Sequence, residues 1–177
     1  HKGQKNPVRD AEGLERPATS SGLPLLYGKH AALSALANPQ RRIRRLLLTL
    51  RSRDGLQSEI EQALSKGGHS NIEILTLDKR DFEDHLPHGA VHQGIALEAE
   101  APQSLHIEDI INQTAKDAKA TIVILDQATD PHNIGAILRS AAAFGATAVV
   151  IQDRNSPVIT GTMAKAASGA LEHVALV

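Results

Sequence analysis

From Leu23 onward, apolar runs of strand length alternate with segments in which apolar residues have helical spacing. This alternation predicts a mixed α/β fold, because a helix between two strands returns the chain to the same sheet. The expected strands cover residues 25–27, 43–50, 72–77, 94–98, 122–125, 148–151 and 171–177. The expected helices cover residues 29–37, 56–66, 80–86, 106–115, 134–144 and 159–168. The strand at 122–125 is continuously apolar, so we expect it to be buried on both faces of a parallel sheet.

The same pattern divides the chain into four parts. Residues 1–22 form a polar N-terminal segment, 23–98 a small α/β domain, 99–119 a polar connection and 120–177 a second unit. The second unit contains two strand-helix units and a third strand that runs to Val177. Because an open parallel sheet needs further strands and covering helices, we expect the sequence to stop inside a domain.

Composition narrows the class of protein. Of the 177 residues, 41% are hydrophobic and 22% are charged, as in ordinary globular domains. No apolar stretch reaches the roughly 18 residues of a membrane-spanning helix, so we expect no membrane partner. The chain has no cysteine, which excludes disulfides and thiolate chemistry and is consistent with a cytoplasmic protein.

Charge is unevenly distributed along the chain. Residues 22–57 carry a net charge of +6, and residues 58–120 carry −7. The basic segment includes a cluster of four arginines at positions 41, 42, 44 and 45. Such a cluster is either a solvated face or a phosphate-binding surface, and the sequence leaves both open. Aromatic residues make up only 2% of the chain, which disfavours recognition of single-stranded bases by stacking.

The segment from Asp126 to Ala146 leads from an expected strand into an expected helix, where open α/β sheets place ligands. Asp130-Pro131 is typical of a turn, Asn133 of a helix cap and Gly145 of a helix C-terminus. Arg139 remains unexplained, because its neighbours on the same helical face are all small. Small side chains around an arginine indicate that another group lies close to this face of the helix, either a second helix or a phosphate and ribose backbone.

Other motifs are weaker. His85, His88 and His92 have a spacing found in metal sites, but Pro87 and Gly89 interrupt the helix that would align them, so we expect no metal. There is no phosphate-binding glycine loop, dinucleotide fingerprint or nucleophile elbow. ATP hydrolysis, ordinary dinucleotide binding and triad hydrolysis are therefore disfavoured.

Three segments resemble a known family. Residues 130–141, DPHNIGAILRSA, resemble the first motif of the SpoU/TrmH RNA 2'-O-ribose methyltransferases of the SPOUT superfamily. Residues 26–32 and 91–96 are similar to the start and end of the L30e-like RNA-binding domain that precedes the catalytic domain in some members. The order of the two parts is most like that of members that modify large-subunit ribosomal RNA.

The resemblance implies an N-terminal L30e-like α/β/α domain, followed by the first part of a trefoil-knotted SPOUT domain that dimerises. It implies S-adenosylmethionine as methyl donor. The donor pocket is expected C-terminal to Val177, so we expect this chain alone to be inactive. Family roles place Asn133 near the reacting ribose and make Arg139 the residue that activates its 2'-hydroxyl. Because arginine stays protonated, we expect Arg139 to act as a cation that stabilises developing negative charge.

We expect RNA contacts from the basic cluster and from both ends of the small domain, namely Lys29, Arg41, Arg42, Arg44, Arg45, His92 and Gln93. Ribose methylation of ribosomal RNA is the leading hypothesis, and a transfer RNA 2'-O-methyltransferase is the nearest enzymatic alternative. A non-catalytic RNA-binding module also fits the sequence. A generic nucleotide-binding protein fits the fold but lacks the glycine motif. DNA is not expected as a partner.

Overall fold

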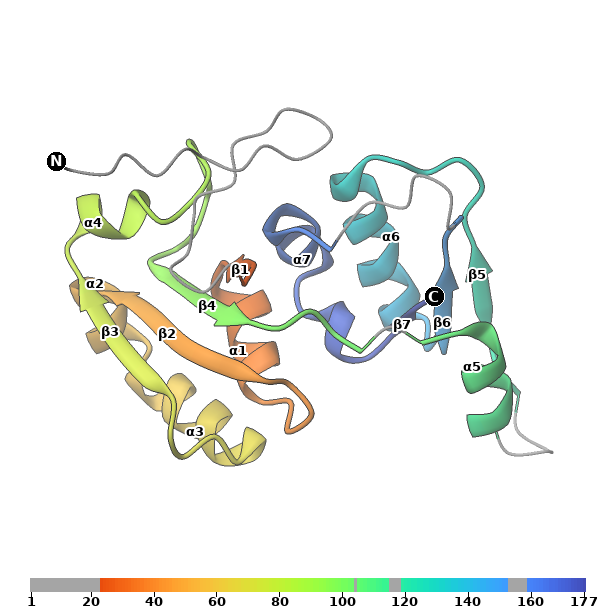
Figure 1. Ribbon diagram of the computed structural model, residues 1–177, viewed down its shortest axis with the longest axis horizontal. Helices are drawn as coiled ribbons and strands as arrows, with labels where there is room; N and C mark the ends of the chain where they lie inside the picture. Colours follow the sequence, from red (N-terminus) through yellow and green to blue (C-terminus); the bar gives the residue numbers. More distant parts are fainter. Residues whose placement is uncertain (1–22, 104, 115–118, 153–158) are drawn as a thin grey trace, which may run out of the picture.

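The computed structural model describes residues 23–103, 105–114, 119–152 and 159–177. They form a mixed α/β structure with two sheets (Figure 1). The first sheet has the order β1-β4-β2-β3, with bounds β1 Leu25–Tyr27, β2 Ile43–Thr49, β3 Glu73–Leu77 and β4 Ile95–Ala99. Strands β2 and β3 run parallel, and β4 pairs antiparallel with both β1 and β2.

Helices cover both faces of the first sheet. They are α1 (Lys29–Leu36), α2 (Leu50–Gly55), α3 (Gln57–Gly67) and α4 (Lys79–Glu83). In β2, Leu46 and Leu48 join the core formed with α1 and α3, whereas Leu47 packs with Phe82 of α4. Successive strand residues point to opposite faces, which explains the unbroken apolar run in β2.

Caps formed by neighbouring residues place the end of β2 and the bounds of α3 at other residues than the sequence predicted. The side chain of Thr49 accepts a hydrogen bond from the backbone N–H of Ser52, so the chain turns helical at Leu50 rather than continuing the strand. The helix expected at 56–66 is therefore preceded by a separate helix, α2. Helix α3 ends at Gly68, which has the left-handed φ of +68° that suits glycine.

The second sheet is parallel, with order β5-β6-β7. Its strands are β5 (Ile122–Ile124), β6 (Ala148–Val150) and β7 (Ala175–Leu176), and α5 (Ile107–Gln113) precedes it. Helices α6 (Pro131–Ala143) and α7 (Gly161–Ala167) and the 3-10 helix η1 (Ala170–Glu172) connect the strands. The long final strand expected at 171–177 is wrong, because η1 occupies its first residues.

The expected burial of β5 on both faces is also wrong. Ile122 is 37% exposed and Ile124 is 76% exposed. In the part of the chain that the structure describes, β5 is an edge strand that pairs only with β6. A strand with one neighbour is covered less than a central strand, so the apolar run alone did not determine its burial.

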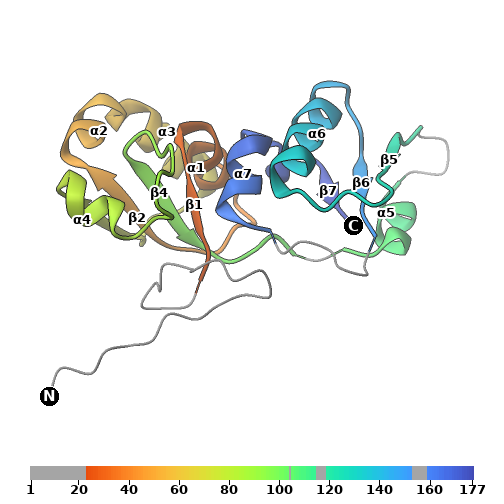
Figure 2. The ribbon, with the colours of Figure 1, turned by 90° about the horizontal axis from the view of Figure 1, so that it is seen from above.

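Helix α7 packs against both halves of the structure. It lies between α6 and the small domain in two perpendicular views (Figures 1 and 2), and one hydrophobic cluster runs through all three parts. A Cβ on Gly161 would lie 2.5 Å from the backbone oxygen of Leu25 and from the ring of Tyr27. The absence of a side chain at this position therefore lets the start of α7 lie directly on β1.

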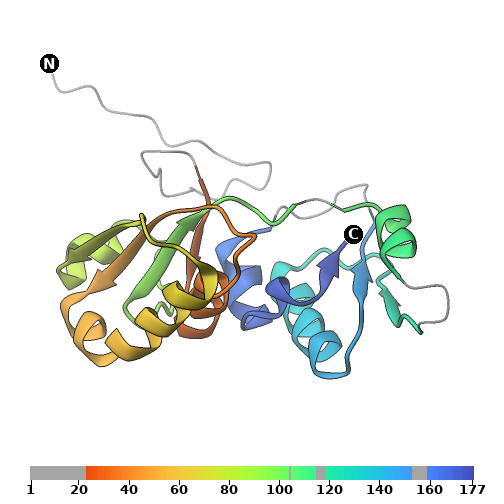
Figure 3. The same ribbon diagram turned by 90° about the horizontal axis from the view of Figure 1, so that it is seen from below.

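Figure 3 shows the same arrangement from below, with the chain crossing from the first sheet to α5 along one side of the molecule. None of the helices in the described ranges is long and apolar enough to cross a membrane.

Candidate functional site

The structure does not gather the four clustered arginines on one surface. Arg41 is buried: its Nε and Nη2 each lie 3.0 Å from Oε1 of Glu172, and its Nη1 donates to the backbone oxygen of Glu100 at 2.7 Å. Its guanidinium thus joins the small domain to η1 rather than facing solvent. The sequence predicted that Arg41 contacts RNA. In the structure its guanidinium is instead buried against the carboxylate of Glu172, which is distant in the sequence.

The other three arginines occupy different environments. Arg45 pairs across the sheet with Glu98, which has no exposed surface. Arg44 is exposed, and Arg42 is 83% exposed and 3.8 Å from a carboxylate oxygen of Glu100. Arg44 and Arg45 are successive residues of β2 and therefore point to opposite faces of the sheet. Arg42 and Arg44 are the two members that face solvent.

A cavity of about 630 Å³ opens at the carboxyl ends of β2 and β3. It brings together three of the residues expected to contact RNA, Lys29, His92 and Gln93. Arg51, just beyond the arginine cluster in the sequence, and Lys79 add two cations that are not among the residues expected to contact RNA. The signal that could have found them is their position directly after parallel strands, where open sheets place ligands.

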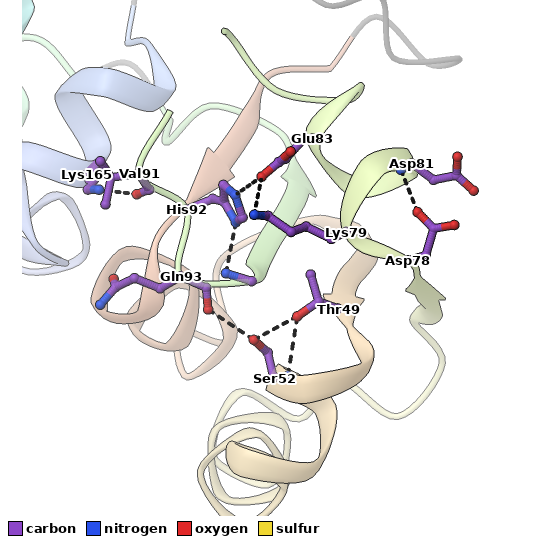
Figure 4. A network of polar contacts seen from close by, with 11 residues as sticks. Thr49, Ser52, Asp78, Lys79, Asp81, Glu83, Val91, His92, Gln93 and Lys165 are labelled. Carbon is purple, nitrogen blue, oxygen red and sulfur yellow. Dashed lines mark hydrogen bonds and ion pairs between the residues drawn. The ribbon is translucent and has the colours of Figure 1, made fainter. Parts of the chain in front are cut away.

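A tight turn holds His92 and Gln93 at the mouth of this cavity, which we call the first cavity (Figure 4). Gln93 and Gly94 have φ angles of +55° and +74°. The side-chain oxygen of Gln93 accepts from the backbone N–H of Lys29 at 3.0 Å, and the hydroxyl of Ser52 donates to its backbone oxygen at 3.1 Å. The turn thus connects the start of α1 to the start of α2.

His92 is fixed from three sides. Its Nδ1 accepts from the backbone N–H of Gly94 at 2.9 Å, and its ring packs at 4.9 Å from that of Phe82. Its Nε2 lies 3.6 Å from a carboxylate oxygen of Glu83 (Figure 4). Because Nδ1 accepts, the neutral ring carries its proton on Nε2 and directs it toward Glu83.

A second cavity of about 490 Å³ lies between the 87–91 turn of the small domain and helices α6 and α7. Its described lining includes Arg139 and His132 from α6, Lys165 from α7 and His88 from the turn. Helix α6 is set by its local sequence: Asp130 accepts from the backbone N–H of His132 at 2.9 Å, and Pro131 opens the first turn.

Asn133 is exposed but is not among the residues that line the second cavity. Asn133 lies six positions before Arg139, and six steps of about 100° place the two side chains on different faces of the helix. His132 is seven residues before Arg139 and therefore shares its face. The structure brings Arg139 together with His132 rather than with Asn133.

The small residues beside Arg139 are explained by α7. A Cβ on Gly135 would lie 2.5 Å from the backbone oxygen of Met163 and 2.7 Å from Cβ of Ala166. Of the two sequence-based explanations, close packing of another helix therefore applies at Gly135. Ala136, the next residue, lines the second cavity and leaves space in front of Arg139.

Lys165 was not identified from the sequence, because it lies far from the motif that contains Arg139. Its Nζ donates to the backbone oxygen of Val91, which ties α7 to the small domain (Figure 4). Partial burial lowers the pKa of Lys165 below its usual 10.5 by desolvating the ammonium group. Its aliphatic stem lies beside Gly28.

The histidines of the weak metal motif make other contacts. Nδ1 of His85 lies 2.7 Å from the backbone oxygen of Asp81, and His92 is engaged as described above. Across the described ranges, no group of three histidine or carboxylate side chains is placed to hold a metal ion.

Two family models match the chain. The model described as the SpoU rRNA Methylase family matches residues 120–177, and that described as RNA 2'-O ribose methyltransferase substrate binding matches residues 25–105.

Curated relatives agree with these matches. The chain is 35% identical over 153 residues to the 23S rRNA (guanosine-2'-O-)-methyltransferase RlmB of Vibrio vulnificus, covering 86% of this chain and 60% of the relative. It is 36% identical to the protein of the same name from Haemophilus influenzae, with the same coverage. An uncharacterized tRNA/rRNA methyltransferase of Synechocystis is 34% identical, and the match covers 90% of this chain and 41% of that relative. The chain thus spans about half the length of the curated relatives it matches.

Solved structures show the same fold. The SpoU methyltransferase AviRb from Streptomyces viridochromogenes, solved with AdoMet, matches with a TM-score of 0.63 and 19% identity over 89% of this chain and 56% of its own. An rRNA methyltransferase from Sinorhizobium meliloti matches with a TM-score of 0.63 and 21% identity over 86% of this chain and 53% of its own.

Proposed function

Because this chain belongs to the SpoU/TrmH family of RNA methyltransferases, we propose that it is part of an enzyme that methylates a ribose 2'-hydroxyl in large-subunit ribosomal RNA. The observation that carries this proposal is Arg139, exposed on α6 at a cavity whose opposite wall comes from the small domain. The small domain would bind the RNA, and the second part would carry the reacting groups. We place this activity in the cytoplasm.

The proposed chemistry is transfer of a methyl group to the ribose 2'-oxygen. As the oxygen attacks the methyl carbon, it loses its proton and develops negative charge. Arg139 remains protonated and offers five N–H donors, so it suits stabilisation of this charge and binding of the adjacent phosphate. Asn133, exposed near the amino end of the same helix, would contact the ribose from another side.

We propose S-adenosylmethionine as the methyl donor, since two of the similar structures are described with AdoMet bound. When bound, it supplies the electrophilic methyl group. Neither cavity described above includes the carboxyl ends of β5, β6 or β7. We therefore assign neither cavity to the donor.

For the RNA surface we propose a set centred on the first cavity and extended by the exposed arginines just before and within β2. It consists of Lys29, Arg42, Arg44, Arg51, Lys79, His92 and Gln93. Arg41 and Arg45 belong to internal ion pairs instead. The combination of cations with few aromatic residues favours contact with the phosphate backbone over stacking on bases.

We also propose a fold for each of the two parts of the chain. The small domain, residues 23–98, would be L30e-like, and residues 120–177 would begin a knotted SPOUT domain that forms a homodimer. The exposed apolar residues Ile122 and Ile124 on edge strand β5, together with Phe144 at 88% exposure, are compatible with further packing on this side.

The test is transfer of label from tritiated S-adenosylmethionine to unmodified large-subunit ribosomal RNA by the whole enzyme of which we propose this chain to be part. We expect label in this RNA at a phosphodiester that resists alkaline cleavage, because a 2'-O-methyl group blocks attack by the 2'-oxygen. Label in transfer RNA only would support the alternative enzyme. Tight RNA binding without label would support a non-catalytic RNA-binding module.

A further inference from the structure

The second cavity carries positive charge contributed by two parts of the chain. Arg139 comes from α6 and Lys165 from α7, while His88 lies on the 87–91 turn of the small domain. Among the described residues that line this cavity, none is acidic. The first cavity, in contrast, includes Asp78. Cations that share a cavity without a carboxylate favour an anionic ligand.

Lys165 lines this cavity, and among the residues that the structure describes no carboxylate pairs with its ammonium group. The Nζ donates to the backbone oxygen of Val91, which is a neutral acceptor, and the stem lies beside Gly28. An ammonium has three N–H donors, so this contact leaves donors for a ligand. Partial desolvation also disfavours its charged form in the free protein, and a phosphate would reverse that effect.

Arg139 and Lys165 are brought together by the contact between their helices. Gly135 and Ala166 lie at a tight contact between α6 and α7, one turn before Arg139 and one residue after Lys165. Ala136 keeps the space between them free of a long side chain. His132, one further turn back on the same face of α6, adds a third nitrogen-bearing side chain.

We propose that the second cavity binds a phosphodiester of the substrate RNA between Arg139 and Lys165. Lys165 is then a positioning residue, and the 87–91 turn forms one wall of the site beside the reacting ribose. This inference rests on the proposed function only in taking RNA as the substrate. It connects the two parts of the chain physically, because RNA bound by the small domain would meet Arg139 in a cavity that both parts line.

The first experiment measures binding of a labelled hairpin of about 30 nucleotides from large-subunit ribosomal RNA at several KCl concentrations. We expect Lys165→Met to weaken binding about three- to tenfold and to reduce the magnitude of the salt slope by about 0.7–0.9, the loss of one phosphate contact. Lys165→Arg should retain the slope. Lys66→Met removes the charge of an exposed lysine outside both cavities and should match the wild type.

A second variant leaves the contact between Lys165 and Val91 intact. Ala136→Glu introduces a carboxylate into the cavity, and Gln62→Glu makes the same charge change on exposed α3. We expect only Ala136→Glu to weaken hairpin binding, by about tenfold, because it repels phosphate. Thermal melting of each variant checks that the fold is retained.

The inference is overturned if folded Lys165→Met keeps the wild-type affinity and salt slope, or if Ala136→Glu binds the hairpin as tightly as Gln62→Glu. These binding measurements do not depend on methyl transfer. A whole enzyme that binds the hairpin without methylating its RNA would refute the proposed function, while the variants would still decide the role of the cavity. Methylation with unchanged slopes in the variants would refute the cavity assignment alone.

Discussion

Arg41 and Glu172, 131 residues apart in sequence, form a buried ion pair in which Nη2 and Oε1 are 3.0 Å apart. Their side chains are only 3% and 4% exposed. The other carboxylate oxygen of Glu172 accepts from the side-chain amide of Asn38 at 2.7 Å. The pair therefore holds the segment between α1 and β2 against η1, so the small domain and the second unit cannot separate without exposing or isolating two charges.

Removing one member of this pair should be costly. We expect Arg41→Met to lower the free energy of unfolding by about 3–5 kcal/mol, because Glu172 is left charged and buried without its partner. Urea unfolding followed by circular dichroism measures the change. The matched variant Arg42→Met removes an 83% exposed arginine and should change stability by no more than about 0.5 kcal/mol. Equal effects of the two substitutions would show that the buried pair has no special role.

Close packing between α6 and α7 predicts a strong effect at Gly135. Gly135→Ala places a Cβ 2.5 Å from the backbone oxygen of Met163, and we expect it to cost about 1–3 kcal/mol of stability through overpacking. Gly55→Ala is the control, since its Cβ would meet nothing within 4 Å, and it should be neutral or slightly stabilising. A neutral Gly135→Ala variant would mean that the helices separate readily at this point.

Arg139 should matter for chemistry and not for folding. We expect Arg139→Ala to abolish methyl transfer to ribosomal RNA while changing stability by no more than about 0.5 kcal/mol, since the side chain is exposed. The measurement combines the labelled-donor assay with thermal melting. Arg80→Ala, on the exposed part of α4 and outside both cavities, should retain full activity. Retained turnover in Arg139→Ala would remove Arg139 from the reaction.

The first cavity predicts a separate phosphate contact. Arg51→Gln should reduce the magnitude of the salt slope for binding of the RNA hairpin by about 0.7–0.9, because one exposed cation at the cavity is lost. Lys66→Gln removes the same charge on α3, away from the cavity, and should leave the slope unchanged. Identical slopes for both variants and the wild type would show that RNA does not use the first cavity.

Lys165 predicts a pH dependence of RNA binding. Desolvation lowers the pKa of Lys165 in the free protein, and an adjacent phosphate would raise this pKa again. At pH values between the two pKa values, RNA binding is therefore accompanied by the uptake of one proton by Lys165. We expect hairpin affinity to fall as the pH rises through the lowered pKa toward 10.5, and Lys165→Met to lose this component.

The sign for folding is opposite to the sign for binding. Between the lowered pKa and the usual 10.5, the unfolded chain holds more protons at Lys165 than the folded chain, so the contribution of this residue to stability rises with pH. Titrations of binding and of unfolding, each compared between wild type and Lys165→Met, separate the two effects. Parallel trends in both titrations would contradict the assignment.

Local signals in the sequence were sufficient for much of the fold. Strand β1 lies at the expected residues 25–27. The expected start of α6 is wrong: the helix begins at Pro131 rather than at 134, because Asp130 and not Asn133 caps it. The apolar run at 46–48 is a buried strand as expected, the mixed α/β class is confirmed, and two SpoU family models match the segments that carry the resemblance. Strand alternation and a contiguous motif depend on neighbours along the chain, so they can be read before folding.

Only the tertiary structure decided which charges remain available. Arg41 and Arg42 are adjacent in sequence, yet Glu172 buries one of them while the other stays in solvent. Ile124 looks like a core residue from its neighbours but lies on an edge strand, and Lys165 meets the Arg139 cavity through a contact with Val91, 74 residues away. Burial and ion pairing depend on which distant segment packs beside a side chain, and that is set by the fold as a whole rather than by local sequence.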